Sequence, residues 1–186
     1  MKMFEIYLPS EDFDRLERFH AIEQVQSHSR ESSNAFGGLN RALSWMTKCN
    51  CAILSGWRKS NTREENDENN RFIRNALRKF GYGVCKCRGC YPEGDLTVSA
   101  ENSFFVFDYN GTGPIFFDRI KTLSTQFEQD CFLFIEAGTG ARPYLYGTND
   151  FFGIGRKEFL GPLHLGVFGK ESFTRIGKKE ISFGEE

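Results

Sequence analysis

The sequence predicts an α+β domain with the ferredoxin-like order of strand, helix, strand, strand, helix and strand (βαββαβ). Two continuous apolar runs, Cys51–Trp57 and Ser103–Tyr109, are typical of strands buried on both faces. They take the first and third strand positions, which lie in the middle of a ferredoxin-like sheet. This agreement between the apolar runs and the central positions favours the ferredoxin-like class.

The first predicted helix follows the first strand. Thr62 and Glu65 have the spacing of a capping box, and Gly81 is a typical stop signal. Between them, apolar residues recur at helical spacing: Phe72, Ile73, Ala76, Leu77 and Phe80. We therefore expect an amphipathic helix over residues 62–80.

The remaining elements complete the series. Tyr82–Tyr91 alternates between two sets of side chains, as a half-exposed edge strand does. Pro114 suits the first turn of a second helix, whose apolar stripe ends at Phe127. A third apolar run, Cys131–Ala137, predicts the last strand of the series.

Two further segments flank this series. Residues 1–48 are expected to form a helical N-terminal extension, with short helices after Ser10 and from Leu39 to Lys48. The domain itself spans residues 49–186. From about residue 143 its sequence is rich in glycine, which predicts a short strand, long loops and a final strand that cover one face or edge of the sheet.

Composition and charge narrow the function classes. The 186 residues include 24 basic and 25 acidic side chains, a net charge of −1, so no global positive field recruits nucleic acid or anionic membrane. No leader segment and no bilayer-length apolar stretch is present, which predicts a protein of the cytoplasm with reduced cysteines. No cofactor is predicted.

Cys85, Cys87 and Cys90 are candidate zinc ligands, because thiolates bind zinc. Together with Cys49 and Cys51 they do not make the two Cys-x-x-Cys pairs of a zinc ribbon, so we interpret them as free thiols and predict no metal site. The segments "NGTGP" and "AGTGARP" lack the lysine of a phosphate-binding Walker loop, and we interpret both as turns.

Polar residues from five segments are predicted to meet at one end of the sheet, where the first strand ends. Loops at such a rim carry function while the sheet holds them in place. The candidate ligand-binding residues at this rim are Trp57, Arg58, Asn70, Arg71, Arg88, Tyr91, Glu101, Ser103 and Gln129.

These residues also carry a resemblance. The sequence resembles a family of bacteria and their phages that is classed as a domain of unknown function, over roughly residues 52–148. The shared features are a strand ending in Trp57, the pair Asn70 and Arg71, the Glu101-x-Ser103 motif, and the Phe127-x-Gln129 motif. The resemblance implies a small accessory protein of a phage or mobile element and implies no particular reaction.

Two function classes follow. The first is a non-enzymatic binding protein, a phage accessory or counter-defence factor, whose arginines and aromatic residues bind a host protein or a nucleotide ligand. The alternative is an enzyme that acts on a nucleotide or nucleic acid, with Glu101 as general base and Arg71 and Arg88 on phosphate. A single-strand RNA binder is a further alternative, because "ENSFFVFDY" partly matches the RNA-recognition signature.

Overall fold

The computed structural model describes residues 38–92, 98–139, 142–165, 173–176 and 179–184. These residues form helices and strands in the following order: α2 (Gly38–Met46), β1 (Cys51–Ser55), α3 (Arg63–Lys79), β2 (Gly83–Pro92), β3 (Val98–Phe107), α4 (Pro114–Gln126), β4 (Cys131–Ile135), β5 (Pro143–Gly147), β6 (Lys157–Phe159), β7 (Leu163–Leu165), β8 (Phe173–Ile176) and β9 (Lys179–Phe183).

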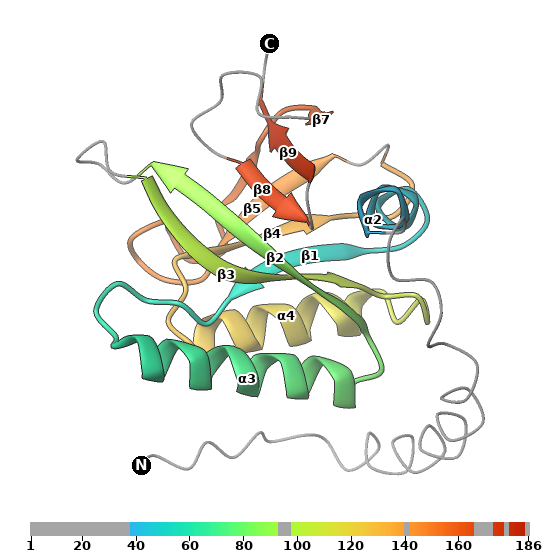
Figure 1. Ribbon diagram of the computed structural model, residues 1–186. Coiled ribbons are helices and arrows are strands. Elements are labelled where there is room, and N and C mark those ends of the chain that lie inside the picture. The colour runs from blue at the N-terminus through green and yellow to red at the C-terminus, as the bar shows by residue number, and fades with distance from the viewer. Residues whose placement is uncertain (1–37, 93–97, 140–141, 166–172, 177–178, 185–186) are drawn as a thin grey trace.

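All nine strands belong to one antiparallel sheet in the order β6-β5-β4-β1-β3-β2-β8-β9-β7. Figure 1 shows that the sheet curves strongly and that α3 and α4 lie side by side on one of its faces. The α2 helix lies on the other side of the sheet. The molecule is therefore a curved half-barrel with helices on both faces.

The predicted ferredoxin-like fold class is wrong. The glycine-rich segment from about residue 143 was expected to hold a short strand, long loops and a final strand. It supplies β5 to β9 instead and extends the sheet beyond β4 on one side and beyond β2 on the other. The prediction failed because these strands are only three to five residues long. Such short segments carry almost no periodic signal in the sequence. Their strand conformation depends instead on pairing with neighbouring strands.

The face under α3 and α4, which we call the helical face, holds an aromatic core. Alternate residues of β1 and β3 point into it, together with apolar residues of both helices. Its fully buried large side chains include Phe116, Phe132, Ile73 and Leu77. Burying such side chains is the main driving force for folding, so this layer anchors the sheet.

The predicted capping box at the start of α3 is confirmed. The Thr62 hydroxyl accepts a hydrogen bond from the Glu65 backbone N–H at 3.2 Å, and the Glu65 carboxylate accepts one from the Thr62 backbone N–H at 2.8 Å. These bonds lower the pKa of Glu65, because they favour its charged form. The helix therefore starts at a fixed point relative to the end of β1.

The opposite face, which we call the α2 face, is covered by α2 at one end. Ala42 and Met46 are buried against Cys51, Ile53 and Phe105. The helix expected from Leu39 to Lys48 is thus present as α2, but it belongs to the core and is not a separate extension. The earlier helix expected after Ser10 lies outside the described residues. Within the described part of the chain, no helix is long and apolar enough to cross a membrane.

Candidate functional site

The connection between β1 and α3 is held in place by asparagine side chains of α3. Asn70 Oδ1 accepts a hydrogen bond from the Gly56 N–H at 2.9 Å. Asn66 accepts one from the Arg58 N–H at 2.8 Å and donates one to the Arg58 carbonyl at 2.9 Å. Both asparagines are buried, so few other partners compete for these bonds. The backbone that carries Trp57 and Arg58 is therefore fixed against α3.

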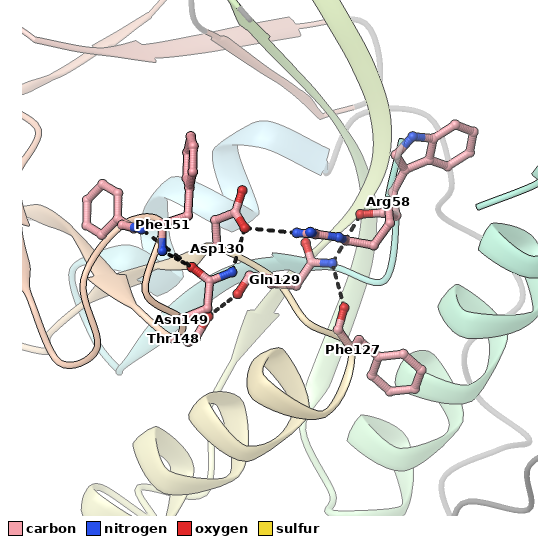
Figure 2. Close-up of polar contacts among 9 residues, drawn as sticks. Arg58, Phe127, Gln129, Asp130, Thr148, Asn149 and Phe151 are labelled. Carbon is pink, nitrogen blue, oxygen red and sulfur yellow. Dashed lines mark hydrogen bonds and ion pairs between the residues drawn. The ribbon is translucent and has the colours of Figure 1, made fainter. Parts of the chain in front are cut away.

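The loop between α4 and β4 meets this connection. The buried Gln129 amide donates to the Trp57 carbonyl at 3.1 Å and to the Phe127 carbonyl at 3.2 Å. Next to it, Asp130 forms an ion pair with Arg58 at 2.9 Å (Figure 2). The two charged side chains are 32% and 40% exposed, so water screens the pair and its contribution to stability is below about 1 kcal/mol.

The loop between β5 and β6 is the third segment at this end of the sheet. The Asn149 amide donates to Asp130 Oδ1 at 2.6 Å, and its oxygen accepts from the Phe151 N–H at 3.1 Å (Figure 2). The Thr148 hydroxyl donates to the Gln129 carbonyl. Three loops that are far apart in sequence are thus joined into one polar network.

A row of small residues crosses the α2 face at the same end. Ser55 of β1 pairs in register with Ser103 of β3, which pairs in turn with Cys87 of β2. One step further along β3, Glu101 pairs with Gly89 and accepts a hydrogen bond from the Ser103 hydroxyl at 3.5 Å. Residues two apart on a strand share a face, so the Glu101 carboxylate stands beside this row.

The charge of Glu101 reaches the thiols on either side. Burial raises the pKa of Cys131 to about 12, with smaller contributions from the charges of Asp130 and Glu101. Burial also raises the pKa of Cys87, with help from Cys85 and Glu101. Because the thiolate is the reactive form, neither thiol is set up as a nucleophile near neutral pH. Glu101 is the carboxylate that stands beside this row.

The structure brings together some of the predicted site residues. Trp57, Arg58, Asn70 and Gln129 meet in the loop network, and Glu101 and Ser103 lie on the α2 face of the same sheet end. In this network Asn70 and Gln129 bind protein backbone, which makes them supports of the loops.

Two predicted arginines lie elsewhere. Arg71 is on the exposed side of α3, where it pairs with Glu68 at 3.4 Å. Arg88 neighbours Gly89 on β2, so its side chain lies on the face opposite to Glu101. Tyr91 belongs to β2, and its side chain lies outside the described set. The expected convergence of all nine residues is therefore only partial.

Sequence reasoning missed Asn66, Asp130 and Asn149. Asn66 lies four residues before Asn70 on the buried side of α3, and two buried amides at that spacing are a detectable signal. Asp130 and Asn149 gave no local signal, because their partners come from other loops.

The described cysteines are not arranged as a metal site. Among the residues that the structure describes, no three histidine, cysteine, aspartate or glutamate side chains are grouped to hold a metal ion. Cys85 and Cys87 share the α2 face of β2, while the Cys90 side chain lies outside the described set.

Comparison with known proteins bears on the function of the chain. No curated protein matches the chain. Residues 52–180, more than two thirds of the chain, match the model of the S-adenosylmethionine lyase family. Both predicted function classes are therefore wrong, the non-enzymatic binding protein and the enzyme or binder acting on nucleotides or nucleic acid. The sequence-based hypotheses used arginine side chains to bind a phosphate group, and S-adenosylmethionine has no phosphate group. The chain belongs to the S-adenosylmethionine lyase family.

Proposed function

We propose that this protein cleaves the bond between sulfur and Cγ of S-adenosylmethionine without adding water. The family match carries this proposal, because it runs from β1 into β9 and so contains the complete row of small residues with Glu101. A lyase breaks a bond without hydrolysis or oxidation. The positively charged sulfonium of the substrate is itself a good leaving group.

The simplest balanced reaction is an internal displacement. One oxygen of the substrate's carboxylate attacks Cγ, the Cγ–S bond breaks, and its electron pair goes to sulfur. The products are methylthioadenosine, a neutral thioether, and homoserine lactone, which keeps its ammonium group. A carboxylate and a sulfonium lose their charges together in this step, so an environment that is less polar than water accelerates it.

The α2 face offers such an environment. Ser55 and Ser103 are buried to 2% exposure, and the row they form continues into the apolar layer of Ile53 and Phe105. A carboxylate next to the sulfonium would stabilise the starting state more than the transition state, since the sulfonium charge disappears. We therefore assign Glu101 to the ammonium group of the substrate, whose charge does not change.

Trp57 and Arg58 are the proposed contacts from the loop network. The indole of Trp57 offers a flat apolar surface on which an adenine ring can stack. The Arg58 guanidinium pairs with Asp130, and we propose that it also contacts the polar edge of the ligand. Tyr91 remains a predicted contact from the sequence, whereas Arg71 and Arg88 lie away from this site.

The test is product analysis by mass spectrometry after incubation with S-adenosylmethionine in water enriched in oxygen-18. We expect methylthioadenosine and homoserine lactone, with no oxygen-18 in a lactone that is extracted before it hydrolyses. Labelled homoserine formed directly would mean hydrolysis, and unchanged substrate would contradict the proposal.

The same experiment separates two roles of Glu101. If 2-aminobut-3-enoate appears in place of the lactone, the reaction is an elimination that needs a base on Cβ. The general-base role predicted for Glu101 from the sequence would then hold. The phage origin and a host-protein partner stay predictions from the resemblance.

A further inference from the structure

Asp108, at the end of β3, is a buried carboxylate that lacks a compensating cation among the described residues. Its exposure is 1%, and one of its oxygens, Oδ2, accepts a hydrogen bond from the Gly113 N–H at 3.0 Å. The other oxygen, Oδ1, is buried and has no hydrogen-bond partner, and Asp108 forms no ion pair with any described residue. A buried carboxylate in this condition is strongly unfavourable unless something neutralises it.

The loop that follows has the spacing of a cation-binding loop. Its sequence from Asp108 to Gly113 is D-Y-N-G-T-G, which places oxygen-bearing side chains at the first, third and fifth positions and glycine at the sixth. Calcium loops of the type D-x-[DN]-x-[DN]-G use the same positions as ligands, and the glycine permits the sharp turn. In this chain Gly113 has a φ of 55°, in the left-handed region that glycine adopts without strain.

No basic side chain among the described residues pairs with the carboxylate, although the N-terminus of α4 offsets part of its charge. The packed neighbours that sense its charge are the thiols of Cys49 and Cys51 and the phenol of Tyr82. The guanidinium of Arg119, the cation next to Tyr82, is engaged by the Tyr82 hydroxyl at 3.1 Å and by the ring of Phe80. Within the described part of the chain, Oδ1 of Asp108 therefore has neither a hydrogen-bond donor nor a basic side chain as a partner.

We propose that the Asp108–Gly113 loop binds a divalent cation of the calcium class, with Asp108 Oδ1 and the side-chain oxygens of Asn110 and Thr112 as ligands. Hard cations of this kind prefer carboxylate, amide and hydroxyl oxygens. This site is separate from the proposed lyase site and does not depend on it.

The affinity is modest. The loop supplies one carboxylate, and the twelfth position, which holds a bidentate glutamate in strong calcium loops, is Arg119. The positive end of the α4 dipole also opposes a cation. We expect a dissociation constant on the order of 10⁻⁴ to 10⁻³ M for Ca²⁺, the range of the weaker calcium modules.

The test is a terbium titration of the full chain, with tyrosine excitation. Tyr82 and Tyr109 lie close to the loop and can transfer energy to a bound Tb³⁺ ion. We expect saturable emission that Ca²⁺ suppresses by competition. Asp108→Asn keeps an oxygen for the Gly113 N–H and should weaken binding about tenfold or more, since it removes the only carboxylate of the loop. Asp118→Asn, at an exposed position on α4, is the matched control and should bind as the wild type does.

A second variant keeps the proposal testable if Asp108→Asn fails to fold. Asn110→Asp adds a second carboxylate at the third loop position and should tighten Tb³⁺ and Ca²⁺ binding about tenfold. Misfolding cannot produce such a gain. Emission that does not saturate, or affinity that is the same in the wild type and in Asn110→Asp, would overturn the proposal.

Discussion

The two faces of the sheet differ in what they place at the end of β1. On the helical face, large aromatic side chains fill the whole layer, and Phe116, Phe117, Phe132 and Phe134 contact one another in edge and tilted arrangements. On the α2 face, α2 and apolar residues of β8 and β9 pack on the sheet, and a row of small residues with one carboxylate, Glu101, lies at the end of β1. One face is therefore filled by aromatic packing, while the other carries the polar groups that we propose for the chemistry.

The first way to break this comparison is to remove an aromatic ring from the helical face. Phe116 is fully buried, and Phe116→Ala should lower the free energy of unfolding by about 3–5 kcal/mol through lost burial and a cavity. Urea denaturation followed by circular dichroism measures this. Its neighbour Ile115 is 43% exposed, so Ile115→Ala is the control and should change little. Equal effects of the two variants would contradict the assignment of the core.

The second prediction concerns the asparagine support of the site. Asn70→Ala leaves the buried Gly56 N–H without an acceptor, which should cost about 1–3 kcal/mol in unfolding free energy. Asn75 lies on the exposed side of the same helix, and Asn75→Ala controls for the change in helix propensity. If both variants unfold at the same denaturant concentration, the Asn70 contacts do not hold the loop.

The third prediction is a pH dependence that arises on the α2 face. Burial raises the pKa of Cys131 to about 12, above the value of about 8.5 expected in the unfolded chain. The stability from the neutral thiol is therefore fully present below about pH 8.5 and is lost as the pH rises toward 12, by up to about 1.4 kcal/mol per pH unit. Denaturation at about pH 8 and about pH 10.5 should show a smaller drop for Cys131→Ala than for the wild type. An identical drop would mean that this thiol is not buried as described.

The smallest effect is expected from the ion pair between Arg58 and Asp130. Asp130→Asn should cost less than about 1 kcal/mol, and about 1 M salt should remove most of the difference. Asp67→Asn is the control, because the pair of Asp67 with Arg63 is more exposed and longer, at 3.9 Å. A loss above about 2 kcal/mol would show that the pair carries the loop network and is more than a solvent-screened contact.

Local signals in the sequence predicted the elements that form the middle of the sheet. The capping box of Thr62 and the apolar runs of β1 and β3 are complete within a few residues, so they could be recognised without knowledge of the fold. For the segment that forms β5 to β9, only a short strand and a final strand were predicted, because each strand is short and gains its stability from a neighbour. The fold class was wrong for that reason.

The candidate site was only partly predictable. Tracing strand ends placed Glu101, Ser103 and Gln129 at one end of the sheet, but the register that puts Arg88 on the other face needs the paired strands. The reaction was not predicted because the serine, glycine and cysteine residues of this row come from three different strands and form no sequence motif. A substrate with a sulfonium and no phosphate leaves no loop signature of the Walker type.

The central claim, that Glu101 binds the ammonium group of S-adenosylmethionine, is tested most directly by a double-variant cycle on kcat/KM. The substrate is compared with an analogue that has hydrogen in place of the ammonium group, for the wild type and for Glu101→Gln. In the wild type, loss of a charge-assisted contact should lower kcat/KM about 10- to 100-fold. Glu101→Gln should cause a similar loss with the natural substrate and almost none with the analogue. If the two losses multiply, Glu101 does not contact the ammonium group and the claim is contradicted.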